Sequence, residues 1–488
     1  MAAATTTPAP ARVRDLTKGP ITRTLLAFAL PTLGSNVLQS LNGSVNAIWV
    51  GRVLGEGALA ATTNANLIMF LMFSLAFGFG MAGTILVAQS MGASDITGAR
   101  RVIGTASGLF GVTSVMICLL GWIFAPDLLR ILATPPEAQD MALAYLRIIF
   151  LSLPPMFLGM LLTMGMRGMG DAITPLLLML LSVILDAGLN PLLIIGIGPF
   201  PRMGIGGSAA ATLIANYAVL GVGLAYVYAR DLPIRLRGSE LAFLLPDLRV
   251  LSTIFVKGLP MGLHMLLFTF SGLVMVGLVN RAGVNVTAAY GIAQQLWTYV
   301  QMPAMAIGTA VSAMAAQNIG AKRWDRVDAV TRSGVATNIV ITTTMVVLIL
   351  AFDRPMFALF VGGASPVIPI ARHIQLIGTW SFIIFGVTLV IFATVRANGA
   401  VYPPLLILVM SVLVGRIGFA WLLLPRYGTD VLWWSFPAGS AISLGLGLIY
   451  YRRGGWRRDN LMHHMAEEEA AELAFATGEA GGRLSPNG

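Results

Sequence analysis

The sequence carries little charge for its length. Asp, Glu, Lys and Arg make up 11% of the 488 residues, whereas hydrophobic residues make up 57%. Soluble proteins contain roughly 25% charged residues, and the mean hydropathy here is +0.81. A soluble domain of this length needs far more polar surface, so the composition argues against that class and favours a protein embedded in a lipid bilayer.

Reactive and metal-binding residues are also scarce. Cys118 is the only cysteine, which excludes an intramolecular disulfide and a cysteine-rich metal site. The four histidines include no pair with the context of metal ligands. Neither GxxxxGKS nor GxxxxGKT occurs, so this chain does not use ATP to drive transport. These absences predict a protein that is not an enzyme and holds no cofactor.

Long apolar runs dominate the chain instead. About 20 apolar residues in a helix cross a bilayer core of about 30 Å, and twelve runs of this kind occur. A more polar link, residues 228–249, separates the first six from the last six. The predicted fold class is all-α and integral to the membrane, with twelve transmembrane helices in two six-helix bundles. The runs are centred near Leu38, Met72, Val112, Phe157, Leu185, Ala218, Phe270, Met302, Thr342, Ile384, Val412 and Ile442.

Arginine and lysine set the predicted orientation. With the N-terminus inside, the inner segments hold more than twice as many of these residues as the outer ones, as the positive-inside rule requires. The net charge of +10 therefore reports topology and does not indicate nucleic-acid binding. The sequence predicts a plasma (inner) membrane protein with both termini cytoplasmic. Its predicted units are an N-terminal tail (1–20), an N-terminal lobe (21–229), a cytosolic linker (230–249), a C-terminal lobe (250–455) and a C-terminal tail (456–488).

The two halves of the chain repeat each other. VAQSMGA at 87–93 recurs as AAQNIGA at 315–321, and Leu30-Pro31 recurs as Leu259-Pro260. MRGMGDAITP and VRANGAVYPP align in the same way, with an offset of 228 or 229 residues each time. Each half starts inside, so the repeats are parallel and predict two bundles related by an axis along the membrane normal. Such bundles suit transport by alternating access, although a duplication without transport remains an alternative.

One carboxyl group interrupts this apolar chain. Asp186, in SVILDAGLNPLLIIG, is the only acidic residue deep inside a predicted span, about 16 Å below the outer surface at 1.5 Å per residue. Burial favours its protonated form, whereas amide and hydroxyl donors or a bound cation favour its charged form. The sequence therefore predicts a proton or cation site. Polar residues expected at the same depth are Asn190, Asn42, Asn46, Asn64 and Thr212.

A structural ion pair is the alternative for this carboxyl group. Arg147, in MALAYLRIIF, is expected about 14 Å below the same surface. It could neutralise Asp186 permanently, or extend its head group outward to water.

The chain resembles the multidrug and toxic compound extrusion (MATE) family over about residues 20–455. The resemblance rests on the order and spacing of LPTLGSNVLQSLNGSVNAIWVGRVLGEGALAA, VAQSMGA with GARR, MRGMGDAITP, LDAGLNPLLIIG and GIGGSAAATLIANY. It implies twelve helices in two six-helix lobes and export of small organic cations in exchange for inward H⁺ or Na⁺. We expect the protein to work as a monomer in the lipid bilayer.

Residues carried over from the family place the coupling site in the first half. Asp186 and Asn190 match the family's acid and amide pair, and Thr212 matches the hydroxyl of its sixth helix. The chain departs from the family at Asn46, where many members have an aspartate, and near Phe268, where one subfamily has an acid. Sodium usually takes several oxygen ligands, whereas a proton needs one carboxylate, so the sequence favours H⁺ over Na⁺.

The second half offers candidates for a substrate cleft. Gln294, Trp297 and Tyr299 form a polar and aromatic stretch, and His264 and Arg416 lie inside predicted spans. Each could line the cleft, or could serve structure alone. A flippase for lipid-linked oligosaccharide or polysaccharide is the alternative function; its cleft is expected to hold more arginines than Arg416 and Arg147.

Overall fold

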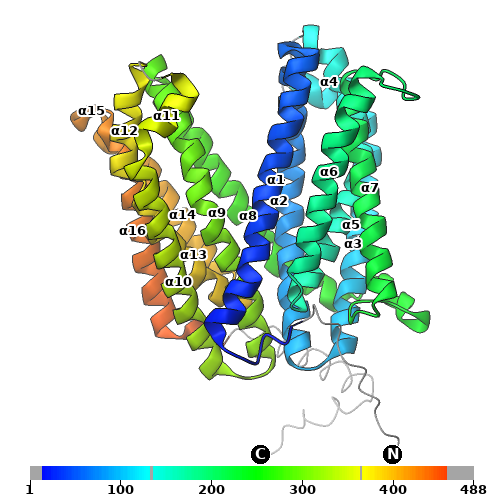
Figure 1. The fold of residues 1–488 in the computed structure, drawn as a ribbon. Coiled ribbons are helices and arrows are strands. Elements are labelled where there is room, and N and C mark those ends of the chain that lie inside the picture. The colour runs from blue at the N-terminus through cyan, green and yellow to red at the C-terminus, as the bar shows by residue number, and fades with distance from the viewer. Residues whose placement is uncertain (1–13, 132–135, 363–364, 459–488) are drawn as a thin grey trace, which may run out of the picture.

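The computed structural model describes residues 14–131, 136–362 and 365–458 and builds them almost wholly from helices. The N lobe consists of α1 (Ile21–Leu54), α2 (Glu56–Gly92), α3 (Ile96–Ile131), α4 (Pro136–Leu151), α5 (Leu153–Gly168), α6 (Ile173–Ile195) and α7 (Ile205–Ala229). The C lobe consists of α8 (Leu248–Asn280), α9 (Val284–Gly320), α10 (Trp324–Ala351), α11 (Asp353–Val361), α12 (Val367–Gly378), α13 (Ser381–Ala397), α14 (Tyr402–Met410), the π-helix η2 (Ser411–Gly418), α15 (Phe419–Tyr427) and α16 (Asp430–Arg453). The two lobes stand side by side and diverge toward one end (Figure 1).

These elements amount to twelve spans. Eight helical stretches are long and apolar enough to cross a membrane, α14–η2–α15 counting as one of them. Two bent pairs, α4–α5 at 46° and α12–α13 at 43°, each supply one more. The remaining two are α1 and α9, which are 34 and 37 residues long but more polar. The predicted all-α class with two six-helix bundles is confirmed, and every predicted span centre falls inside a helix.

The lobes meet where α2 crosses α9, near the end of the molecule at which α1 begins and α16 ends (Figure 1); we call this the terminal end. A Cβ atom on Gly92 would overlap the backbone oxygen of Gln317, and one on Gly320 would overlap that of Gln89. The two glutamines then reach into the opposite lobe. Gln89 Nε2 donates to the carbonyl of Ala397 at 2.6 Å, and Gln317 Nε2 donates to that of Gly168 at 2.9 Å. The repeated segments 87–93 and 315–321 thus hold the two lobes together by reciprocal contacts. We call these contacts the clasp.

The segment before α1 and the start of α8 complete this closure. Leu16 is fully buried; its N–H donates to Gln317 Oε1 at 3.0 Å, and its carbonyl accepts from Asn318 Nδ2 at 3.2 Å. Between α2 and α8, the rings of Phe79 and Phe255 stack with centroids 5.0 Å apart. The terminal end is therefore closed by backbone packing, buried hydrogen bonds and aromatic contact.

Helix α1 passes from one lobe to the other. At its start the hydroxyl of Thr22 lies 2.9 Å from that of Ser333 in α10. Further along, Gly34 allows close approach to the side chain of Leu176 in α6. Figure 1 shows α1 rising from beneath the C lobe to stand beside α6.

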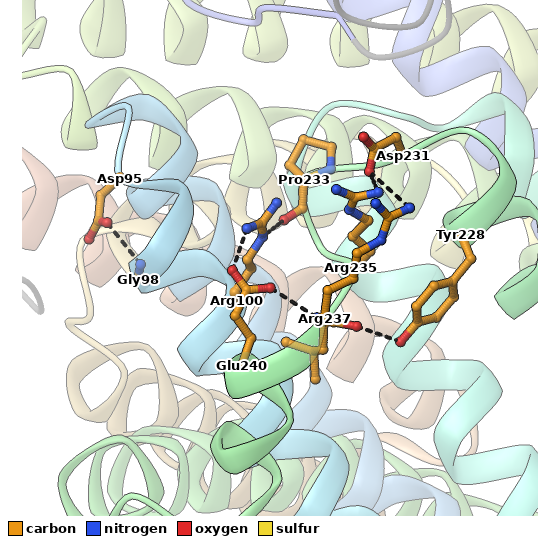
Figure 2. A network of polar contacts seen from close by, with 10 residues as sticks. Asp95, Gly98, Arg100, Tyr228, Asp231, Pro233, Arg235, Arg237 and Glu240 are labelled. Atoms are coloured by element: carbon orange, nitrogen blue, oxygen red, sulfur yellow. Dashed lines mark hydrogen bonds and ion pairs between the residues drawn. The ribbon is translucent and has the colours of Figure 1, made fainter. Parts of the chain in front are cut away.

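The linker between the lobes is folded onto the N lobe. It forms a short 3-10 helix, η1 (Gly238–Leu244), whose backbone packs closely against Gly104 and Gly108 of α3. Arg100 Nη1 lies 2.5 Å from Glu240 Oε1, and its Nε donates to the carbonyl of Pro233 at 3.0 Å (Figure 2). Asp231 pairs with Arg235 in the same network. The predicted cytosolic linker therefore folds over the start of α3. We call this folded linker the strap.

The close crossing predicts that Gly320→Ala opens the terminal end. The added methyl group would overlap the backbone at Gln89, which costs about 1–3 kcal/mol in a packed core. Spin labels on the exposed residues Ser94 and Lys322, one in each lobe, should report longer distances in this variant.

The matched control is Gly291→Ala in the same helix, because a Cβ atom there meets nothing within 4 Å. It should leave the label distances unchanged. Equal distances in the wild type and Gly320→Ala would contradict a closure that depends on this crossing.

The ion pair between Arg100 and Glu240 in the strap predicts that the wild type and Glu240→Gln differ in stability by an amount that depends on pH. A hydrogen bond from the backbone N–H of Arg237, together with Arg100, holds the pKa of Glu240 below its usual value of 4.5. The stabilisation is therefore complete above pH 4.5 and is lost as pH falls through the lowered pKa. Glu240→Gln should lower the melting temperature at pH 7, and the difference should vanish near the lowered pKa. Asp325→Asn, at an exposed site in α10, is the control and should show no comparable difference.

Candidate functional site

Asp186 lies on α6 and is 2% exposed. The apolar run around it forms a helix that packs between α1 and α7, which turns this position toward protein instead of lipid. Thr212 Oγ1 of α7 donates to Asp186 Oδ1 at 3.0 Å. The sequence placed these two residues at the same depth, and this contact joins them across two helices that a loop separates.

Asn190 is fully buried one helical turn further along α6. Its Nδ2 donates to the backbone carbonyl of Asp186 at 2.8 Å, and not to the carboxylate. Its Oδ1 is buried and has no hydrogen-bond partner among the described residues. Asn190 therefore positions the helix at Asp186 and leaves one acceptor oxygen unused beside the acid.

Helix α1 brings two further asparagines to the acid. The amide of Asn42 contacts the carboxyl group of Asp186. Asn46 Oδ1 accepts from Ser208 Oγ at 2.6 Å, and Asn46 also contacts the buried hydroxyl of Tyr145. The side chain of Asn64, the remaining predicted member, lies outside the described residues.

Ser208 and Tyr145 are site residues that sequence reasoning missed. Ser208 stands in GIGGSAAAT, four residues before Thr212 and so on the same face of α7. Tyr145 stands two residues before Arg147, which drew attention for its charge. The signal for Ser208 was present in the helical spacing, whereas Tyr145 could be found only from the packing of α4.

Arg147 packs on an aromatic ring and does not pair with the acid. Its guanidinium carbon lies 4.9 Å from the ring centroid of Trp122 in α3. Within the described part of the chain it forms no ion pair with Asp186. The acid is therefore surrounded by neutral hydroxyl and amide groups.

A cavity of about 480 Å³ opens beside this network in the N lobe. Asn46 and Tyr145 form part of its wall, so it adjoins the group of residues around Asp186. Phe70, Phe73 and Met69 of α2 supply an apolar side. We call this the N-lobe cavity.

A second cavity, of about 510 Å³, lies in the C lobe. Four of the five predicted cleft residues line it: His264, Gln294, Trp297 and Arg416. Gln39 of α1 lines both cavities, so this helix forms the wall between them. We call this second space the C-lobe cavity.

Tyr299 is the exception among those five. It is 43% exposed, its hydroxyl accepts from Gln295 Nε2 at 3.3 Å, and it does not line the C-lobe cavity. Residues two apart on a helix point to different faces, so Trp297 and Tyr299 cannot share one. Tyr299 therefore lies on another face of α9, and its place in the substrate cleft stays a prediction.

Trp297 is a fixed part of the cavity wall. Its Nε1 donates to Gln375 Oε1 and to Thr379 Oγ1, both at 2.9 Å, and its ring lies 4.7 Å from that of Phe436. A buried indole with a satisfied N–H keeps one orientation. It therefore gives the cavity a rigid aromatic surface.

No metal centre accompanies these cavities in the part of the chain that the structure describes. No group of three His, Cys, Asp or Glu side chains comes together there.

Comparison with known proteins accounts for this arrangement. A sequence model of the MatE family matches residues 31–192 and again residues 260–422. The chain belongs to the MatE family. The two matches begin at Pro31 and Pro260, which are the paired prolines of the internal repeat.

Curated relatives and solved structures agree with that assignment. The chain is 35% identical to the probable multidrug resistance protein YoeA of Bacillus subtilis, over 89% of this chain and 94% of the relative. It is 30% identical to the probable multidrug resistance protein YpnP of the same organism, over 91% and 97%. A multidrug resistance MATE family transporter solved in an outward-facing conformation has the same fold, with a TM-score of 0.83 at 21% identity over 92% of this chain and 98% of that one.

Membership of the MatE family confirms several predictions. The protein is a multi-pass membrane transporter of the multidrug efflux type and is not an enzyme. Transporters of this family act on small molecules. The two cavities are each within the usual 300–1,000 Å³ of a small-molecule site.

The neutral surroundings of Asp186 predict that Asp186→Asn folds normally. Breaking a buried ion pair costs about 3–5 kcal/mol, because it leaves one charge alone. Here the partner is a hydroxyl that can still donate to the amide oxygen, so the loss should stay below about 1.5 kcal/mol. Thermal unfolding of the purified variant measures this.

The ion-pair alternative gives the opposite result. It requires Asp186→Asn to be strongly destabilised and Arg147→Ala to restore its stability in the double variant.

Proposed function

We propose that this MatE protein is a secondary active antiporter, which exports small organic cations in exchange for H⁺, with Na⁺ as the alternative ion. The observation that carries the proposal is the isolated carboxyl group of Asp186, held in the N lobe by Thr212 and Asn42. A buried acid with neutral partners can gain and lose a proton during each cycle. Both termini are cytoplasmic in this proposal, and the protein works as a monomer in the plasma membrane.

The chemistry of the site favours the proton over sodium. Asp186 supplies the one carboxyl group in this network. The side-chain NH₂ group of Asn190 donates to the backbone carbonyl of Asp186 and not to its carboxylate. Hard cations take several oxygen ligands, whereas a proton needs one carboxylate oxygen. The unused Oδ1 of Asn190 keeps sodium as the alternative.

The clasp at the terminal end supports exchange by rocking of the lobes. The positive-inside rule places this end in the cytoplasm. A molecule closed there has its cavities accessible from the outer side, which is the state that takes up a proton and releases drug. The opposite state requires Gln89 and Gln317 to leave the carbonyls that they bind in the other lobe.

Competition between cation and proton couples the export of drug to the entry of H⁺. A cationic drug in the N-lobe cavity lies beside the network around Asp186 and is stabilised by its negative charge. Protonation removes that charge, so each ligand weakens the binding of the other.

A flippase of similar architecture finds less support. A lipid-linked pyrophosphate is expected to need several arginines. Arg396 and Arg416 line the C-lobe cavity, but no described arginine lines the N-lobe cavity, and Arg147 lies over Trp122 outside both. Each cavity also has the volume of one drug-sized molecule.

The antiport proposal predicts efflux that follows the proton gradient and requires Asp186. Proteoliposomes loaded with ethidium should release it through the wild-type protein when H⁺ flows in the opposite direction, and an imposed Na⁺ gradient should have little effect. Asp186→Asn should reduce the gradient-driven rate to the background of empty liposomes.

The control is Asp325→Asn, an exposed acid of α10 away from both cavities, which should transport like the wild type. Efflux that depends on neither gradient, or that persists at the wild-type rate in Asp186→Asn, would rule out this mechanism.

A further inference from the structure

The lining of the C-lobe cavity is cationic. The positive charge comes from Arg396 and Arg416, and the lining contains no Asp or Glu. The four carboxyl groups of the described C lobe lie elsewhere. Asp353 pairs with Arg372 at 2.8 Å, Asp430 lies 2.9 Å from His373, Asp328 pairs with Arg457 at 2.7 Å, and Asp325 is exposed at the start of α10.

Arg416 is held in the cavity wall by an unusual stretch of backbone. It belongs to η2, the π-helix that interrupts α14 and α15. Wider turns of this kind are frequent at functional sites. The guanidinium carbon lies 3.8 Å from the ring centroid of Phe436, and the group also faces Tyr290. Its position is therefore fixed by aromatic packing.

The guanidinium of Arg416 is incompletely satisfied. Its Nε is buried and has no hydrogen-bond partner among the described residues. A buried N–H without an acceptor costs free energy, and an anionic oxygen is its strongest partner. Arg396, only 8% exposed, adds a second positive charge to the same space.

The remaining walls suit the body of an aromatic compound. Trp297, Phe382, Phe385 and Phe436 present ring surfaces, and Gln294 and Gln301 add amide groups. A volume of about 510 Å³ accommodates a molecule of about three fused rings. A cation would meet two arginines here with no carboxylate to offset them, whereas an anion would meet complementary charge.

We propose that the C-lobe cavity binds aromatic organic anions, with Arg416 as the anchor for their negative group. This inference rests on the proposed function, since it adds a second substrate class to the same exporter. Cations then use the N-lobe cavity beside Asp186, and anions use the C-lobe cavity across α1.

Binding of three xanthene dyes to the full-length protein in detergent tests the proposal. Fluorescein is anionic, rhodamine 110 is a zwitterion, and rhodamine 123 is the cationic ester on the same three-ring body. Fluorescence anisotropy at pH 7.4 should show that Arg416→Gln weakens fluorescein binding about tenfold or more, the usual loss when a charge-assisted hydrogen bond is removed. It should weaken rhodamine 110 less, and strengthen rhodamine 123.

Two further variants separate binding from folding. Arg416→Lys keeps the charge and should retain part of the affinity for fluorescein, even if Arg416→Gln folds poorly. Arg426→Gln removes an exposed arginine at the end of α15 outside the cavity and should bind all three dyes like the wild type.

The outcomes also separate this inference from the antiport proposal. Wild-type protein that fails to bind fluorescein, or binds it equally well after Arg416→Gln, overturns the anion site. Fluorescein binding that depends on Arg416, combined with ethidium efflux that follows no ion gradient, supports the anion site and overturns the coupling mechanism instead.

Discussion

The reciprocal contact between α2 and α9 is the constraint on which the rest of the molecule depends. Gly92 and Gly320 bring two backbones together, and Gln89 and Gln317 each bond to a carbonyl of the opposite lobe. A buried polar group left without a partner costs free energy, so the lobes separate only when these groups exchange partners. That requirement favours two discrete arrangements over continuous bending, which is what alternating access needs.

The two lobes share one fold but differ in electrostatics. The N lobe keeps a carboxyl group among neutral donors, and the C lobe keeps arginines among aromatic rings. The position equivalent to Asp186 in the second repeat is Gly415, which instead packs against Gly439 and the side chain of Ile442. Its neighbour Arg416 supplies charge of the opposite sign. Duplication therefore preserved the helices while the polar layer diverged.

The sequence predicted features that depend on composition and local spacing. Apolar runs located the twelve spans, and position along those spans placed Asp186 and Thr212 at a common depth, where the structure joins them by a hydrogen bond. The repeat around Gln89 and Gln317 was visible, but its role was not, because no local pattern shows that two helices cross. Arg396 was visible in the repeat motif VRANGAVYPP, but only packing places its side chain in a cavity wall. Tyr299 is close to Trp297 in sequence, yet the two side chains lie on different faces of α9.

The carboxyl group beside the N-lobe cavity and the arginines in the wall of the C-lobe cavity have an electrical consequence. If one proton enters in each cycle, a monovalent cation leaving in exchange moves no net charge across the membrane. An anion leaving instead moves the equivalent of two positive charges inward. The same carrier would then be indifferent to membrane voltage for one class of cargo and driven by it for the other. In energised cells, whose interior is negative, the driving force for anion export would then increase with membrane voltage.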